Sequence, residues 1–370
     1  MMIKENSYWH RFPLILVAGI SLLVGLWAGI ARMGWPVLPN SEVVLIHGPL
    51  MVVGFLGTLI GLERAVALQR GWAYGIPVCA GLSALTALLM IPSQISASLA
   101  VFASVLLTIA FITLYRQYPS EHFVIMALSA LAWLVGNAMW FSGAAIFALV
   151  PWWVAYLVLM IAGERLELSR VRQPTAWIRC AFHGSVAVIL IGLASSIFDL
   201  HTAIRTSGVG FLALGVWLLR YDLAWQSAKQ SGLPRFMALS LIAGYAWLAV
   251  GGILWVALAS YFSAGPRYDA MLHSIFLGFV FSMIFAHAPI ILPTITGLAL
   301  PFRNIFYFHA GLLHLSVVLR IFGDLTQSLR LQQWGGLLNA AAILLFLVNN
   351  VLTVRRGAGV HALRKVNSLS

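Results

Sequence analysis

Two histidines, His47 and His273, have the residue type and the placement to bind a metal inside a membrane. Each lies a few residues into a long apolar segment, after a charged residue at the segment's start: Glu42 precedes His47, and Asp269 precedes His273. At about 1.5 Å rise per residue, both imidazoles are expected about 6–8 Å below the same membrane face, provided that both segments run in the same direction. An ionisable side chain at this depth is a functional-site hypothesis. Two at matched depth predict a shared ligand.

Small residues follow both histidines, and they have two interpretations. Gly54 lies seven positions after His47, which places it under the imidazole at about 100° per residue. Ser274 and Gly278 follow His273. Small residues either let membrane helices pack closely or leave space for a flat ligand. In the second case, two neutral imidazoles facing each other across a porphyrin would ligate the iron, with Gly54 beside the cofactor.

Arginines near the outer ends of apolar segments are candidate partners for the two propionates of a haem. Arg320 is the first of these candidates, followed by Arg267 and Arg32. Guanidinium groups form strong hydrogen bonds with carboxylates. The alternative is that each arginine only extends from the membrane edge into water.

The remaining histidines are less informative. His287 lies 14 positions after His273 but deeper, and with His183 and His309 it could form an inner metal site; interhelical hydrogen bonds are the alternative. His309 and His314 are five positions apart, which turns them about 140° from each other, so they cannot be a same-face ligand pair. Four others lie in tails or at segment ends, where solvation explains them: His10, His122, His201 and His361.

The composition is that of a polytopic membrane protein. Of the 370 residues, 61% are hydrophobic and 9% are charged, and the mean hydropathy is +0.95; a soluble domain has about 25% charged residues. The net charge of +12 is spread over short loops, so it does not indicate a nucleic-acid partner. The two cysteines form no CxxC motif. We expect one integral membrane domain over residues 1–370, in contact with lipid.

Twelve apolar runs are long enough to cross a bilayer, at about 20 residues each. Because open backbone cannot face lipid, they predict an all-α bundle of about twelve membrane-spanning helices. The connectors between the third and fourth runs and between the fifth and sixth are short and uncharged. The runs are 12–31, 43–62, 72–92, 95–115, 122–142, 144–162, 178–198, 203–220, 236–262, 270–292, 303–322 and 333–354.

The distribution of basic residues predicts the orientation of these helices. If both termini are cytoplasmic, 17 of the 22 Lys and Arg residues face the cytoplasm and five face the outside. Cytoplasmic loops are enriched in Lys and Arg. We therefore expect both termini inside a bacterial inner membrane, and His47 and His273 near its outer face.

A short internal similarity suggests three four-helix units. The second run ends in Gly61-Leu62-Glu63-Arg64, and the sixth ends in Gly163-Glu164-Arg165. The second, sixth and tenth runs are the second members of three successive groups of four. The alternative is that Glu-Arg pairs simply anchor helices at the cytoplasmic face.

The two histidine segments resemble those of NnrS-like proteins. His47 opens HGPLMVVGFLGTLIG, and His273 lies in LHSIFLGFVFSMI, within a similar stretch over 271–323 that includes the Thr296-Gly297 turn and Arg320. NnrS-like proteins are twelve-span bacterial membrane proteins that contain haem and are linked to nitric oxide and nitrosative stress. The resemblance implies a haem site, taken as b-type, at His47 and His273, with copper as a further cofactor and nitric oxide as a small ligand.

This sequence departs from the family's pattern at two places. A second histidine just after the first is missing, because Pro49 follows Gly48, and the tenth helix ends in Ala286-His287-Ala288-Pro289 in place of a Gly-His-Thr-Gly-Arg run. The resemblance is therefore that of a divergent relative.

The layout is also similar to the catalytic subunits of haem–copper oxidases, which hold a bis-histidine haem between helices 2 and 10. Their copper ligands are not matched here. The sixth run offers Trp152, Trp153 and Tyr156, and the tenth has no His-x-His motif. We therefore expect a haem site without a haem–copper reductase activity.

A secondary transporter or facilitator for a small solute is the alternative function for twelve spans. All ten acidic residues lie in tails, loops or span ends. Proton-coupled carriers usually need a carboxylate within the membrane, so the sequence favours a facilitator over a proton-driven carrier.

Overall fold

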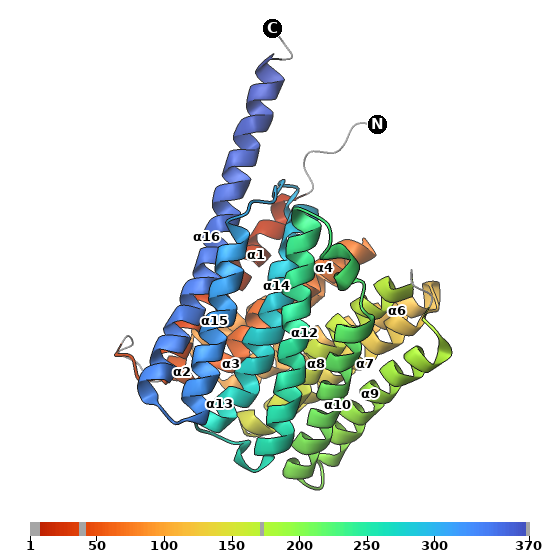
Figure 1. Ribbon diagram of the computed structural model, residues 1–370, viewed down its shortest axis with the longest axis vertical. Helices are drawn as coiled ribbons and strands as arrows, with labels where there is room; N and C mark the ends of the chain where they lie inside the picture. Colours follow the sequence, from red (N-terminus) through yellow and green to blue (C-terminus); the bar gives the residue numbers. More distant parts are fainter. Residues whose placement is uncertain (1–7, 37–41, 171–173, 368–370) are drawn as a thin grey trace.

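The protein is a bundle of membrane-length helices. A computed structural model describes residues 8–36, 42–170 and 174–367, and this part of the chain is helical with no strand (Figure 1). Within these ranges, twelve helical spans are long and apolar enough to cross a membrane. The predicted all-α architecture is confirmed, including the separation of the spans joined by short connectors.

Several spans are built from more than one element. The second span combines α3, η2 and α4, and the tenth combines α13, η6 and α14. In chain order the elements are η1 (Trp9–Arg11), α1 (Phe12–Arg32), α2 (Glu42–Leu45), α3 (His47–Pro49), η2 (Leu50–Gly57), α4 (Thr58–Leu68), η3 (Gly71–Tyr74), α5 (Gly75–Leu88), α6 (Ser93–Gln117), α7 (Glu121–Phe141), α8 (Ile146–Ser169), α9 (Ala176–Ser195), α10 (Leu200–Tyr221), α11 (Ala224–Ser227), α12 (Leu233–Leu258), η5 (Ala259–Tyr261), α13 (Pro266–His273), η6 (Ser274–Phe281), α14 (Ser282–Thr296), α15 (Phe306–Leu325) and α16 (Leu329–Asn367).

Three spans form the interior of the bundle. The shares of buried residues in the most apolar part of the second, sixth and tenth spans are 61%, 72% and 67%, the highest of the twelve. The other spans pack around them, and α16 returns to contact α1, while its last part projects beyond the bundle on the side of η1 (Figure 1). This burial agrees with three groups of four in which the second member is central.

The two Glu-Arg sequences at the ends of the second and sixth spans contact each other. Arg64 forms ion pairs with Glu63 and with Glu164. Next to this cluster, Arg165 binds Asp222 through two hydrogen bonds of 2.8 Å, and both side chains are buried. Both Glu-Arg pairs therefore join helices to each other inside the protein, in addition to marking the span ends.

A helix break precedes His47. The helix of α2 ends at Leu45, Ile46 is not helical (φ −91°, ψ 5°), and His47 begins α3. A proline ring collides with the carbonyl four residues earlier but fits the first turn of a helix. Pro49 therefore ends the helix at Leu45 and makes His47 the first residue of the spanning helix.

Both histidine spans contain a π-helical segment close after the histidine, starting three residues after His47 and directly after His273. These segments are η2 and η6, each eight residues long. A π-helix has i→i+5 hydrogen bonds, is rare, and is frequent at functional sites. The two segments contact each other through Phe55 and Phe281, whose stacked rings lie 6.1 Å apart. Because a π-helix turns less per residue than an α-helix, it changes which of the following side chains point in the same direction as each histidine.

Candidate functional site

A cavity of about 830 Å³ lies between the ends of several spans and contains both histidines in its lining. This volume is within the range of small-molecule and cofactor sites, about 300–1,000 Å³. Its charged and ionisable lining residues come from the first, second, tenth and eleventh spans. They are Arg32, His47, Asp269, His273, Arg320 and Asp324.

The ring of His47 is fixed by the first span. Its Nδ1 lies 2.7 Å from the carbonyl oxygen of Gly25. Since a carbonyl can only accept, Nδ1 donates its hydrogen and Nε2 keeps a lone pair. Gly29 permits this approach, because a Cβ there would lie 3.0 Å from the ring atom Cε1. His47 therefore presents the tautomer in which Nε2 can bind a metal.

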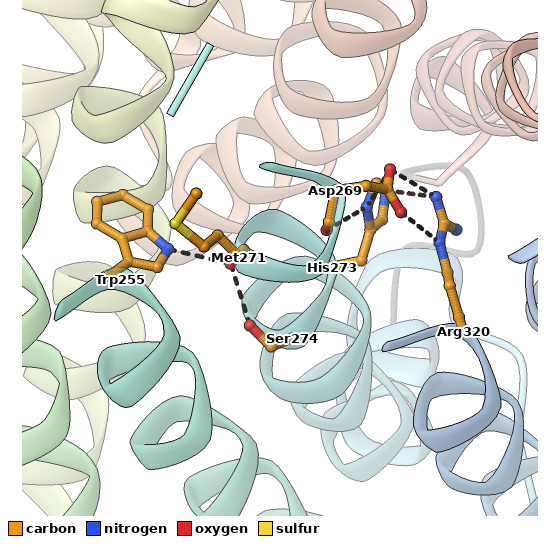
Figure 2. A network of polar contacts seen from close by, with 6 residues as sticks. All are labelled: Trp255, Asp269, Met271, His273, Ser274 and Arg320. Carbon is orange, nitrogen blue, oxygen red and sulfur yellow. Dashed lines mark hydrogen bonds and ion pairs between the residues drawn. The ribbon is translucent and has the colours of Figure 1, made fainter. Parts of the chain in front are cut away.

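The ring of His273 is fixed by Asp269 one turn earlier (Figure 2). Its Nδ1 lies 3.0 Å from Asp269 Oδ1 and 3.1 Å from the Asp269 backbone oxygen. Both partners accept, so Nδ1 again donates. A carboxylate hydrogen-bonded to the far nitrogen is the usual companion of a metal-binding histidine. Both histidines thus have a protonated Nδ1 and an unprotonated Nε2.

Arg320 lies beside His273 and is paired with Asp269. Its Nε and Nη2 donate to the two carboxylate oxygens at 2.7 and 2.9 Å, and Nη2 lies 3.4 Å from His273 Nε2 (Figure 2). Its charge is therefore compensated by Asp269, and Arg320 lines the cavity together with both histidines. Arg267 stacks over Tyr261 at 4.1 Å and is not in the cavity lining. Arg32 lines the cavity and forms no ion pair with the described residues.

The deeper walls of the cavity are apolar. Leu56 and Phe281 come from the two π-helical segments, and Trp153 comes from α8. The indole of Trp153 donates to Asn137 Oδ1 at 2.9 Å, which fixes the ring. The backbone oxygen of Met271, just before η6, accepts from Trp255 Nε1 and Ser274 Oγ, both at 3.0 Å (Figure 2). The start of η6 is thus held from two sides.

Gly54 is not part of the cavity lining, contrary to the expectation. The second span lines the cavity at His47, Gly48, Met51, Val52 and Leu56. The face argument for Gly54 used the α-helical angle, whereas Gly54 lies in the π-helical segment η2, which turns less per residue. A Cβ at Gly54 would lie 2.7 Å from Ala84 Cβ on α5. Gly54 is therefore a close-packing position.

Gly278 on η6 behaves in the same way. A Cβ there would lie 2.5 Å from the indole of Trp247 on α12. The packing interpretation of these small residues is therefore the one that the structure supports.

The inner histidines do not come together as a metal site. His183 faces Glu121 at 3.5 Å, His287 bonds to the Met283 backbone oxygen at 2.7 Å, and His309 contacts Asn349 at 3.1 Å. Over the described ranges, no group of three or more His, Cys, Asp or Glu residues could hold a metal ion. The hypotheses of an inner metal cluster and of a metal at His287 are therefore not supported.

Other histidines have distinct surroundings. His314 accepts from Trp247 on α12, while His309 faces α16, as expected from their 140° separation. His122 is buried and lies 2.6 Å from Ser120 Oγ, so solvation does not explain it. His201 bonds to the Ala259 backbone oxygen and stays exposed.

Two acidic residues of the site were not identified as site residues from the sequence. Asp269 was used only as a marker of a span start, although its position four residues before His273 places the two on one helix face. Asp324 is buried in the cavity lining, and its Oδ2 has no hydrogen-bond donor among the described residues. No pattern in the sequence distinguishes Asp324 from the other carboxylates at span ends.

The comparisons with known proteins place the chain in a family. Residues 11–355 match a family described as a domain of unknown function (DUF8744), which is most of the chain. No match was found among curated proteins. The chain is a multi-pass membrane protein and belongs to the DUF8744 family.

Proposed function

We propose that this protein binds a b-type haem in the outer half of a bacterial inner membrane and, like the NnrS-like proteins it resembles, acts in the response to nitric oxide. One observation carries the proposal: His47 and His273 line the same cavity, and each Nδ1 is bonded to an oxygen. This hydrogen bonding fixes both rings with Nε2 unprotonated. A metal at His273 Nε2 would replace the hydrogen bond from Arg320 Nη2.

The other lining residues fit the same group. Leu56, Phe281 and Trp153 provide apolar walls for a porphyrin. Arg32 provides an uncompensated cation for a propionate. When bound, haem iron supplies a redox-active centre that binds diatomic gases. Copper is not part of the proposal, because the described residues contain no group of three ligands for it.

A haem titration of the purified full-length protein tests the proposal. We expect a Soret band that grows to one equivalent of haem. His47→Ala and His273→Ala are expected to weaken haem binding by at least about tenfold, since even a lost partner of a ligand costs 10–100-fold. His201→Ala is the matched control and is expected to bind as the wild type does. A wild-type protein without haem-dependent absorbance would refute the proposal.

A facilitator for a small cationic solute is the second candidate, and Asp324 favours it. Its buried carboxylate lines the cavity, and the cavity reaches the helix ends at Gly34 and Ser263. The test is sodium uptake by proteoliposomes that contain the protein. Uptake that is abolished by Asp324→Asn, together with a lack of haem absorbance in the wild type, would favour this candidate over the first.

A further inference from the structure

A second cleft, of about 460 Å³, lies at the opposite ends of the spans from the histidine cavity. Three parts of the chain form it. They are the start of the first span at Arg11, the turn of Gln69 to Gly71 between α4 and η3, and the end of α14 near Thr294. The distribution of Lys and Arg predicts that this face is cytoplasmic. It therefore lies at the level of the inner lipid headgroups.

The cleft is basic. Arg11, Arg70 and His10 line it, and none of its described lining residues is acidic. Tyr8 and Tyr74 complete the walls, and tyrosine is enriched where membrane meets water. Two guanidinium groups beside one cleft form a site for an anion with several oxygen acceptors, such as phosphate.

Arg11 is held in place by backbone oxygens and an aromatic ring. Its Nη1 donates to the backbone oxygens of Thr294 at 3.3 Å and Ile295 at 3.0 Å, and its guanidinium lies 4.9 Å from the centre of the Tyr8 ring. Its Nε is buried and has no partner among the described residues. These described partners orient the guanidinium without neutralising its positive charge.

The turn before the third span places Arg70 at the cleft. Gln69 has φ 53°, which ends α4 and directs the chain at Arg70 into η3, a helix of four residues. Arg70 and Gly71 both line the cleft at this turn.

We propose that this cleft binds a phosphate group, supplied by an anionic phospholipid headgroup. Two features meet there: two arginines that form no ion pair with the described residues, and a polar cleft with tyrosine walls. The position at a membrane face favours a headgroup over free phosphate, which has the same chemistry.

Lipid retention by the full-length protein tests the site. The protein is purified from nanodiscs of phosphatidylglycerol and phosphatidylcholine, and the bound lipids are counted by native mass spectrometry. Arg70→Gln is expected to lower phosphatidylglycerol retention by about tenfold, the loss of one charge-assisted hydrogen bond. Arg116→Gln is the control, because Arg116 is exposed at the end of α6 and lies outside the cleft.

A second arm separates the two sources of phosphate. Sodium phosphate is titrated into delipidated protein by calorimetry. If Arg70→Gln lowers phosphatidylglycerol retention and Arg116→Gln does not, the result supports a lipid headgroup as the source of the phosphate. Binding of inorganic phosphate alone, lost in Arg70→Gln, keeps the phosphate site but assigns it to a free anion. Equal losses in Arg70→Gln and Arg116→Gln, or no binding in either arm, would overturn the proposal.

Discussion

At the scale of single residues, the two histidines have the same tautomer but different partners. A neutral carbonyl fixes His47, whereas a carboxylate fixes His273. A carboxylate partner makes the imidazole a more basic ligand. We therefore expect His273 to be the stronger of the two ligands, with Asp269 as its positioning residue.

Asp269→Asn tests this role. The amide cannot neutralise Arg320 and is a weaker acceptor for His273, so haem affinity is expected to fall about 10–100-fold. The measurement is the haem titration, together with the position of the Soret band. Asp199→Asn is the control, since Asp199 is exposed and bonds only locally to Thr202. Unchanged affinity and an unchanged band in Asp269→Asn would contradict the role.

The sequence predicted the residues of the site better than it predicted their hydrogen-bond and ion-pair partners. Lone histidines within apolar runs are visible in any hydropathy profile, and Asp269 could have been assigned from its spacing to His273. The acceptor of His47 could not have been assigned from the sequence. The Gly25 carbonyl lies beside His47 only because α1 packs on the second span. Arg320 was placed near the site, but its ion pair depends on the same kind of tertiary contact.

At the scale of helices, the π-helical segments decide which side chains enter the cavity. The sequence located the second and tenth spans, since hydropathy depends only on local composition. Their ends differ from the prediction, because the second span ends at Leu68 and the tenth extends over Pro266–Thr296. The sequence did not predict the π-helical segments η2 and η6, because a continuous apolar run has the same hydropathy pattern in an α-helix and in a π-helix. Leu56 and Phe281 consequently replaced Gly54 and Gly278 as the residues that line the cavity.

Gly54→Ala tests the packing role of this glycine. The added Cβ would lie 2.7 Å from Ala84 and 2.8 Å from Ser21, and overpacking of this kind costs about 1–3 kcal/mol. We expect a lower thermal midpoint in detergent, measured by intrinsic fluorescence. Gly19→Ala on α1 is the control, because its Cβ would meet no atom within 4 Å. Equal midpoints for the two variants would show that the helices are not closely packed at Gly54.

At the scale of the whole molecule, buried ion pairs join the central spans at the end away from the histidine cavity. The sequence indicated a relation between the second and sixth spans through their Glu-Arg pairs, but it could not show that Arg64 reaches Glu164. Nor did it predict the ion pair between Arg165 and Asp222, which lie 57 positions apart in the sequence. Such pairings depend on the order in which helices surround one another.

Arg165→Gln tests the contribution of that pair. Asp222 loses both charged hydrogen bonds from Arg165, and breaking a buried ion pair costs about 3–5 kcal/mol. The thermal midpoint is expected to fall by more than in Arg116→Gln, where the arginine is exposed. A midpoint within error of the wild type would show that the pair adds little to stability.

The orientation is tested by single cysteines in a background without Cys79 and Cys180. A cysteine at Gln94 is expected to react with a membrane-impermeant maleimide from outside intact cells, and one at Tyr118 only after lysis. These positions bracket α6, and both residues are exposed. The reverse pattern would place the histidine cavity on the cytoplasmic side.

The proposed haem would be held by both His47 and His273. The most direct measurement is the ultraviolet–visible spectrum of the full-length protein, purified from cells supplied with haem, beside that of the His47→Ala and His273→Ala variants. If both histidines ligate one haem, the wild type shows a Soret band that is shifted or lost in both variants and retained in His201→Ala. A wild-type spectrum without a Soret band, or one that both variants leave unchanged, would contradict this proposal.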